Sequence, residues 1–239
     1  METLRFTLGV ILPYVAVAAF LAGMVCRVYS WKKLPSPPIT LFPAPPTGAA
    51  NLRNTLQEAL LFKSLFRADP GLWLVAWTFH LVLALILLGH LRAFANVDGL
   101  LMKLGMSAGG IQAMSSGVGA AAGLAIGTAA VVLLLRRSAI PRVREITGWS
   151  DCLALLLIGA VVTTGNLMRF GGQHFDLTAT RSYFAGLASF AGAAGAPVLK
   201  NNLFLLHMCL AFLLIMLMPF SKLLHFGGIF FTQHLIRKH

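Results

Sequence analysis

Five separate stretches of roughly 20 mostly apolar residues limit the fold of this chain more than any other feature. They cover residues 6–28, 71–91, 117–135, 151–168 and 202–220. A helix needs roughly 20 apolar residues to cross the ~30 Å hydrocarbon core of a bilayer. The sequence therefore predicts an all-α integral membrane protein with five transmembrane helices in a bundle. We expect the last helix to continue towards Phe231.

The connection between the first two stretches has a composition of its own. Residues 34–46 are rich in proline, which favours an extended, polyproline-like strap. After the strap, Leu52, Leu56, Leu60 and Phe66 recur at helical spacing, which predicts an amphipathic helix on the membrane surface. We interpret residues 1–239 as one membrane domain in which residues 32–69 form the strap and this helix.

Basic residues predict how the bundle is oriented. The chain has 19 Lys and Arg against 7 Asp and Glu, a net charge of +12. Long uncharged runs separate the basic residues, which excludes the solvated basic face of a nucleic-acid-binding protein. Thirteen of the 19 fall on the side of the first connection and six on the other side. The positive-inside rule then places the N-terminus outside and the C-terminus in the cytoplasm.

The same flanking charges bear on the first stretch and on the location of the protein. Arg27, Lys32 and Lys33 follow the first stretch like a stop-transfer flank, so we expect a retained span and not a cleaved signal peptide. The surroundings expected for such a chain are membrane lipid, in the cytoplasmic (inner) membrane of a bacterial or archaeal cell.

Four of the seven histidines lie inside or at the edge of the apolar stretches: His80, His90, His207 and His225. An ionisable group at membrane depth is costly and by default indicates a functional site. Because the second and fifth helices run in opposite directions, His80 should lie level with His225, and His90 with His207. Two imidazoles that face each other at each of two depths can provide axial ligands for two haems.

The spacing of these histidines tests that interpretation. Ten residues on the second helix rise roughly 15 Å, whereas 18 residues on the fifth rise roughly 27 Å. Two straight parallel helices could not place the partners of both histidine pairs at equal depths in the membrane. This would require that Pro219 kinks or ends the fifth helix, or that the haem plane is tilted. The 18-residue spacing also equals five helical turns, which would keep His207 and His225 on one face.

The polar and small residues of the spans also allow roles without haem. A zinc site needs four ligands close together, and Cys26, Cys152 and Cys209 form no C-x-x-C pair. The histidines could also be packed neutral side chains, or a proton relay in a small transporter or a non-haem membrane anchor. Gly119, Gly123 and Gly127 indicate close helix packing. The Gly/Ala-rich residues 105–117 and 185–196 are expected to be connections on the outer side, either irregular or with short re-entrant or interfacial helices.

The histidine spacings carry a resemblance to a known family. His-x9-His in the second span (H-L-V-L-A-L-I-L-L-G-H) and His-x17-His in the fifth resemble the gamma-subunit family of respiratory nitrate reductase, a dihaem membrane cytochrome b. Within it, the strap, residues 58–67 (E-A-L-L-F-K-S-L-F-R) and residues 163–170 (T-T-G-N-L-M-R-F) are most similar to the sulfur-metabolism branch. That branch includes the membrane cytochrome DsrM of the DsrMKJOP complex, linked to dissimilatory sulfite reductase.

This resemblance implies two haem b groups and a quinol substrate. The proximal haem, nearer the cytoplasm, would take His80 and His225 as iron ligands, and the distal haem would take His90 and His207. Menaquinol or ubiquinol would be oxidised near the distal haem, and electrons would pass to a cytoplasmic iron-sulfur subunit. Further membrane and periplasmic subunits are expected, and the gamma subunit of a nitrate reductase is the alternative identity.

A quinol site needs a proton acceptor and polar groups that hold the ring oxygens. The candidates at the right depth are Arg92, Asn166, Arg169, His174 and Asp176. Arg92 and Arg169 could instead bind haem propionates or extend to the membrane surface. For partner docking we expect the strap, the helix at residues 52–66 and the loop at 136–144, although attraction to anionic lipid explains their charge equally well.

Overall fold

A computed structural model describes residues 1–33, 48–171, 176–191, 193 and 195–225. All regular structure in these ranges is helical, which confirms the all-α prediction. Five helices are long and apolar enough to cross a membrane, as expected: Glu2–Lys32, Pro70–Phe94, Ala108–Ala139, Trp149–Phe170 and Asn202–Phe220. The Pro-rich strap, His174 and residues 226–231 lie outside the described residues.

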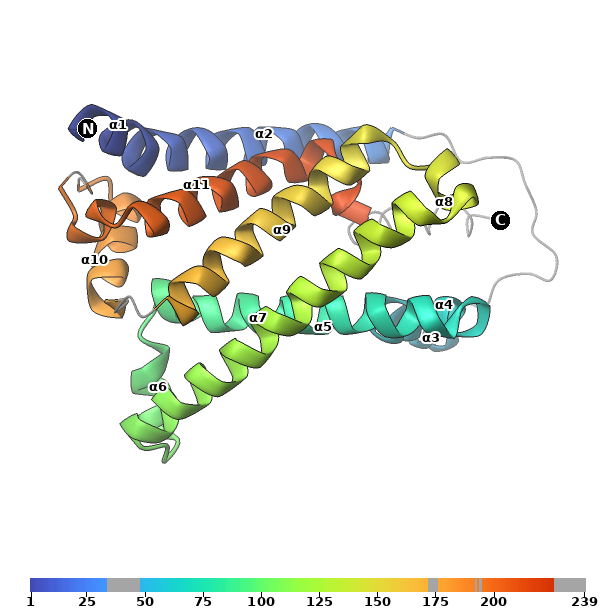
Figure 1. Cartoon of the computed structure of the whole chain (residues 1–239), viewed down its shortest axis with the longest axis horizontal. Coiled ribbons are helices and arrows are strands. Elements are labelled where there is room, and N and C mark those ends of the chain that lie inside the picture. The colour runs from blue at the N-terminus through green and yellow to red at the C-terminus, as the bar shows by residue number, and fades with distance from the viewer. Residues whose placement is uncertain (34–47, 172–175, 192, 194, 226–239) are drawn as a thin grey trace.

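The five spans lie side by side along the long axis of the molecule (Figure 1). The first comprises α1 (Glu2–Phe6), a π-helical turn (Thr7–Ile11) and α2 (Leu12–Lys32). The others are α5 (Pro70–Phe94), α7 (Ala108–Ala139), α9 (Trp149–Phe170) and α11 (Asn202–Leu217). The most extensive contacts between spans run in the order α5, α7, α9, α11 and α2. The contact between α5 and α11, the second and fifth spans, is thus not among the most extensive ones.

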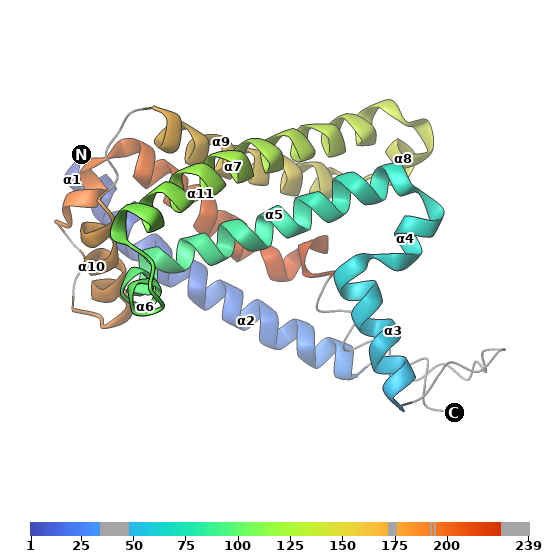
Figure 2. The ribbon, with the colours of Figure 1, turned by 90° about the horizontal axis from the view of Figure 1, so that it is seen from below.

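Short helices cluster at the two ends of the bundle. Figures 1 and 2 place the N-terminus, α6 (Val97–Lys103) and α10 (Leu177–Ala188) at one end, which we call the α10 end. Both views place α3 (Gly48–Leu61), α4 (Lys63–Ala68) and α8 (Pro141–Glu145) at the opposite α8 end. The connections predicted on one side of the membrane thus share one end of the molecule.

Side-chain caps fix where the spans begin. Asp69 Oδ1 accepts a hydrogen bond from the Leu72 amide at 2.9 Å, and Pro70 occupies the first helical position of α5. Asn201 Oδ1 accepts from the amides of Leu203 and Phe204 at the start of α11. Each cap satisfies amides that lack a partner within the helix.

The third span is longer than the sequence indicated. Ser107 Oγ caps it by accepting from the Gly110 amide at 3.0 Å, so α7 begins at Ala108 and not near Gly117. The expectation of a connection over residues 105–117 was therefore wrong for most of that segment. At 32 residues α7 is about 48 Å long, against a hydrocarbon core of ~30 Å. Figure 1 shows it crossing α5 obliquely.

Two glycines of α7 make room for polar side chains of α9. A Cβ atom at Gly123 would collide with Asn166 Oδ1, and one at Gly119 would collide with the Arg169 guanidinium. Asn166 Nδ2 donates to the Gly123 carbonyl at 3.0 Å, and Arg169 donates to the Ser115 carbonyl at 3.1 Å. The glycine motif thus accommodates hydrogen bonds between the helices as well as close packing.

The buried core lies between the spans, and much of the outer surface is apolar. Phe79, Ile126 and Ile158 form one buried cluster between α5, α7 and α9. Tyr183 and Phe204 belong to a second cluster at the α10 end. Large apolar side chains more than half exposed include Leu87, Leu88, Leu124 and Leu156. Such a surface suits contact with lipid.

The fifth span has the predicted bounds, but its regular α-helix is broken near its end. Regular α-helix stops at Leu217, followed by the 3₁₀ turns η3 (Met218–Phe220) and η4 (Lys222–Leu224) with an extended Ser221 between them. Proline cannot donate the helical hydrogen bond and clashes with the preceding turn, which ends the helix at Pro219. An unbroken helical continuation beyond Phe220 was therefore wrong: the chain is extended at Ser221, η4 follows, and His225 is again α-helical, so His207 and His225 do not share a face of one helix.

Contacts with helix α2 stabilise the end of the fifth helix at Pro219. Pro219 is fully buried, and a Cβ atom at Gly23 would lie 2.8 Å from the Pro219 ring. The Pro219 carbonyl accepts a hydrogen bond from Arg27 Nε at 3.2 Å. The contact partly satisfies the carbonyls left free where the helix ends.

The predicted amphipathic helix is two helices with a sharp turn between them. Phe62 separates α3 from α4 and adopts a left-handed backbone conformation, with φ of 50°. The indole nitrogens of Trp73 and Trp77 donate to the carbonyls of Leu61 and Leu60, at 2.7 and 3.0 Å. These bonds hold the end of α3 against α5 and bring Phe62 beside that span.

Candidate functional site

The four membrane histidines meet in two pairs. His90 of α5 and His207 of α11 have ring centroids 6.2 Å apart and ring planes only 15° from parallel. His80 of α5 and His225, which follows η4, have centroids 5.7 Å apart and nearly perpendicular planes, at 89°. The first pair lies towards the α10 end of α5 and the second towards the α8 end. These are the partners that opposed helix directions suggest.

The early end of α11 accounts for the different spacings of the two pairs. The ten residues from His207 to Leu217 rise roughly 15 Å, close to the rise between His80 and His90 on α5. Beyond Leu217 the chain no longer advances as one α-helix, so the extra residues before His225 do not separate the pairs further. Between a kink and an end of the helix at Pro219, the structure shows the end.

Backbone carbonyls orient three of the four imidazoles. The Nδ1 atoms of His80 and His90 each lie 2.7 Å from the carbonyl four residues earlier, those of Ala76 and Ile86. His225 Nδ1 lies 3.0 Å from the Lys222 carbonyl. A carbonyl oxygen can only accept, so Nδ1 carries the proton in each neutral ring and Nε2 presents a lone pair.

His207 is oriented by a side chain of α9. Its Nδ1 lies 2.9 Å from Thr164 Oγ1, which also lies 2.9 Å from the carbonyls of Ala160 and Val161. Because the hydroxyl has one hydrogen and donates it to these carbonyls, it accepts from His207 Nδ1. His207 therefore has the same tautomer as the other three histidines, with Nε2 available as a ligand.

These features fit axial ligation of haem iron. In the described part of the chain, no hydrogen bond engages Nε2 of any of the four histidines. Two imidazoles on opposite sides of one metal ion, with bonds of about 2 Å, place their ring centroids roughly 6 Å apart, as in both pairs. Among the residues described, no three His, Cys, Asp or Glu side chains gather around one point as a zinc site requires. Haem ligation itself stays a prediction.

Two aromatic side chains contact His80, in the pair nearer the α8 end. Phe62 lies edge-on to the His80 ring at a centroid distance of 5.1 Å, and Phe79 lies edge-on at 5.5 Å. The sequence did not indicate Phe62 as a site residue, since its place depends on the turn between α3 and α4. A left-handed conformation at a bulky residue is uncommon and occurs often at functional sites.

Near His90, Arg92 belongs to a charged group at the α10 end. Arg92 Nε and Arg181 Nη2 pair with the two oxygens of Asp98, at 2.6 and 2.8 Å. Arg181 Nε also donates to the Arg92 carbonyl at 2.6 Å. The hydrogen bond from Arg92 holds the pKa of Asp98 below its usual value despite partial burial, and Arg181 adds to this effect. The group joins α5, α6 and α10.

The other residues predicted for a quinol site have separate partners. Arg169 and Asn166 bind carbonyls of α7. Asp176 caps α10, where its Oδ1 accepts from the Ala179 amide at 2.9 Å. His174 lies outside the described residues. Each arginine is thus paired with different groups, and Asp98 and Arg181 are polar residues of this end that the sequence did not single out.

Sequence comparison adds a decisive observation. A family model described as the nitrate reductase gamma subunit matches residues 64–239, a range that includes all four histidines. The chain belongs to this family. The resemblance carried by the histidine spacings is thereby confirmed. The matched range begins within α4 and leaves out the first span and α3.

Individual members of the gamma-subunit family give a finer view. The Hdr-like menaquinol oxidoreductase cytochrome b-like subunit of Archaeoglobus fulgidus is 30% identical over 257 residues, covering 94% of this chain and 77% of its own length. The protein of the same name from Archaeoglobus profundus is 28% identical, with 92% and 76% covered. The nitrate reductase gamma chain of Bacillus subtilis is 28% identical, with 62% and 68% covered. Membership of this family supports the interpretation of the chain as a multi-pass membrane protein that serves as an electron-transfer subunit of an oxidoreductase complex.

Proposed function

We propose that this chain is a dihaem cytochrome b subunit that oxidises a membrane quinol and passes the electrons to a cytoplasmic iron-sulfur subunit. The observation that carries the proposal is the presence of two facing histidine pairs, on α5 and on the segment from α11 to His225. In all four histidines Nδ1 is held by an acceptor, which orients a metal ligand and raises its basicity.

The chain contributes ligands, burial and spacing between two sites. Haem, when bound, supplies reversible one-electron chemistry at its iron. His80 and His225 would hold the haem nearer the α8 end, and His90 and His207 the haem nearer the α10 end. The ten-residue spacing on α5 separates the two sites by roughly 15 Å along the helix. The pairs then divide the path across the membrane into two steps.

Quinol oxidation belongs at the α10 end in this proposal. The distribution of basic residues supports an orientation with that end outside the cytoplasm, in which protons would leave there while electrons move inwards. The charged group around Arg92 lies next to His90 in the sequence, and Arg169, Asp176 and His174 are the further candidates for holding the quinol or accepting its protons. Two relatives are named menaquinol oxidoreductase subunits, which favours menaquinol over ubiquinol as the substrate.

The complex that the chain serves has two candidates. One candidate is a DsrMKJOP-like sulfur-metabolism complex, which rests on the resemblance of the strap and of residues 58–67 and 163–170. The two Hdr-like relatives cover more than nine-tenths of this chain, whereas the Bacillus nitrate reductase subunit covers 62%, which favours a complex other than nitrate reductase. A respiratory nitrate reductase is the second candidate. Purification of the intact complex separates them, because the first should contain an iron-sulfur protein of the disulfide-reductase kind and the second a molybdenum enzyme.

Reduced-minus-oxidised spectra of the full chain, purified from membranes, test the haem assignment. We expect a b-type α-band and two haems per chain. His80→Ala and His225→Ala should each remove one haem, and His90→Ala and His207→Ala should each remove the other together with quinol oxidation. His234→Ala, at a histidine outside the two pairs, is the control and should retain both haems.

Two results would contradict the proposal. Absence of a b-type band from the native chain would favour a non-haem anchor or a small transporter with a histidine relay. An undiminished content of two haems in all four alanine variants would show that these histidines are not the ligands.

A further inference from the structure

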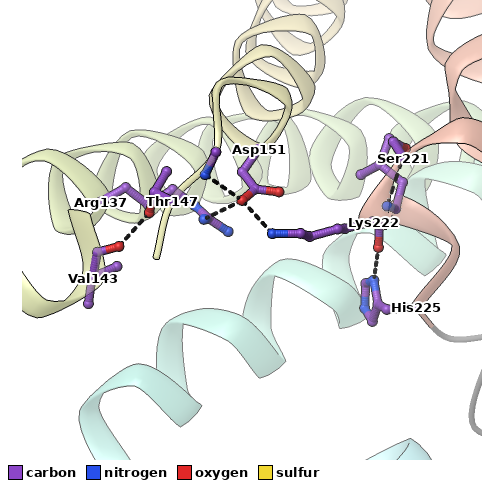
Figure 3. Close-up of polar contacts among 9 residues, drawn as sticks. Arg137, Val143, Thr147, Asp151, Ser221, Lys222 and His225 are labelled. Atoms are coloured by element: carbon purple, nitrogen blue, oxygen red, sulfur yellow. Dashed lines mark hydrogen bonds and ion pairs between the residues drawn. The ribbon is translucent and has the colours of Figure 1, made fainter. Parts of the chain in front are cut away.

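A chain of polar contacts connects α9 to His225 (Figure 3). Asp151 Oδ2 on α9 accepts a hydrogen bond from Lys222 Nζ at 2.8 Å. The carbonyl of the same lysine lies 3.0 Å from His225 Nδ1. The residue whose backbone orients the imidazole is thus also the one whose side chain is tied to a neighbouring span.

His225 needs such a support because the described chain reaches it through a short 3₁₀ turn and not through a continuous α-helix from α11. The 3₁₀ turn η4 spans only Lys222–Leu224 and follows the extended Ser221, whereas His80 and His90 lie within α5. Their acceptors are carbonyls of that same helix, fixed by its hydrogen bonds. The carbonyl that orients His225 belongs to a short turn, so its direction depends on what holds Lys222.

Asp151 is well placed to hold it. The Asp151 side chain is 5% exposed, and the Oδ2 atom that binds Lys222 also accepts from the Gly148 amide at 3.1 Å. Arg137 of α7 lies farther from the same oxygen, at 3.9 Å. A buried carboxylate that accepts a hydrogen bond from a nearby backbone amide is held in place, whereas the Lys222 side chain is 73% exposed.

We propose that Asp151, acting through Lys222, is a positioning residue that sets the direction of the His225 imidazole. The proposal deepens the proposed function and rests on it, since His225 is there taken as a haem ligand. It also gives α9 a defined role. That helix provides none of the four histidines, yet Thr164 orients His207 and Asp151 orients His225, the two ligands that do not lie on α5.

Three substitutions in the full-length membrane chain separate positioning from a general effect of charge. Lys222→Met removes the ammonium group and keeps most of the length of the side chain. Asp151→Asn removes the ionic partner, while its amide oxygen can still accept from the Gly148 amide. Arg137→Met is the matched control, because it removes one positive charge that faces the same oxygen but has no contact with His225. Readouts are haem retention against a haem scavenger, the low-spin signal of each ferric haem and its midpoint potential.

We expect Lys222→Met and Asp151→Asn to weaken haem retention at the His80 and His225 site by roughly tenfold, the lower end of losses for groups that orient metal ligands. The signal of that haem should shift, and the His90 and His207 haem should stay unchanged. The double variant should lose no more than either single variant, because both remove the same contact. Arg137→Met should retain haem as the native chain does.

Three results would overturn the proposal. One is an equal shift in Arg137→Met and Lys222→Met, which would indicate a through-space effect of charge. Another is a native-like His80 and His225 haem in both Lys222→Met and Asp151→Asn. The third is additive losses in the double variant. These results are distinguishable from a failure of the proposed function, because in that case the native chain would show no b-type haem at all.

Discussion

The imidazole rings of His90 and His207 lie nearly parallel, with their planes 15° apart, whereas those of His80 and His225 are perpendicular, at 89°. Axial imidazole planes that are parallel produce a rhombic ligand field at low-spin ferric iron, while perpendicular planes nearly cancel the rhombic splitting. We therefore expect two distinct electron paramagnetic resonance signals from the oxidised protein. The highly anisotropic one should belong to the haem that His80 and His225 would hold under the proposed function.

Single variants assign these signals. His225→Ala should remove the highly anisotropic signal and leave the rhombic one, and His207→Ala should do the reverse. Two signals of the same shape, or the opposite assignment, would show that the imidazole planes of the haem-bound protein are oriented differently.

Thr164 should matter for one haem only. Thr164→Val leaves His207 Nδ1 without its acceptor, and an unsatisfied buried donor costs about 1–3 kcal/mol. We expect haem at the His90 and His207 site to be lost roughly ten times more readily. Thr163→Val is the matched control, because the Thr163 hydroxyl binds the Gly159 carbonyl of its own helix. Equal haem retention in the two variants, followed with a haem scavenger, would argue against a role for Thr164.

The Asp98 carboxylate should make the free energy of unfolding sensitive to acid. Its pKa is lowered in the folded protein from an ordinary value near 3.8, chiefly by the hydrogen bond from Arg92. The ionised carboxylate therefore stabilises the fold above about pH 4, and this contribution is lost as the pH falls towards the lowered pKa. Asp98→Asn should melt below the native chain at pH 7, and the difference should shrink in more acidic buffer. A difference that stays constant with pH would contradict this account.

Gly123 should tolerate no side chain. A Cβ atom there would collide with Asn166 Oδ1, so Gly123→Ala must displace the amide that bonds to α7. We expect a loss of about 1–3 kcal/mol, the usual range for overpacking, measured by thermal unfolding in detergent. Gly117→Ala on the same helix is the control, because a Cβ atom there would have no neighbour within 4 Å among the described residues, and this variant should unfold as the native chain does. Equal stability of the two variants would show that the α7 to α9 contact adapts.

Hydropathy and spacing predicted much of this molecule. A span of apolar residues has few alternatives in lipid, because every backbone polar group must be satisfied within the helix. The pairing of His80 with His225 and of His90 with His207 then followed from opposed helix directions. Those inferences depend on the period and length of segments, which are properties that can be read locally.

The errors concern contacts between distant segments. Pro219 indicated either a kink or an end of the helix, and the choice depends on Gly23 and Arg27 of the first span, almost two hundred residues earlier. The start of α7 depends on the Ser107 cap, a weak signal among Gly and Ala. Asp98 and Asp151 looked like ordinary charges because their basic partners lie on other helices.

The early end of α11 also affects the order in which the molecule can be assembled. A ribosome completes α5 and α9 before it reaches Lys222 and His225, so His80 and Asp151 are already in the chain when the segment after Leu217 emerges. His225 is thus the last of the four paired histidines to be synthesised, and Asp151, whose carboxylate binds Lys222, precedes it. During biogenesis, the His90 and His207 site can form as soon as α11 packs against α9, whereas the His80 and His225 site must wait for the final turn to dock.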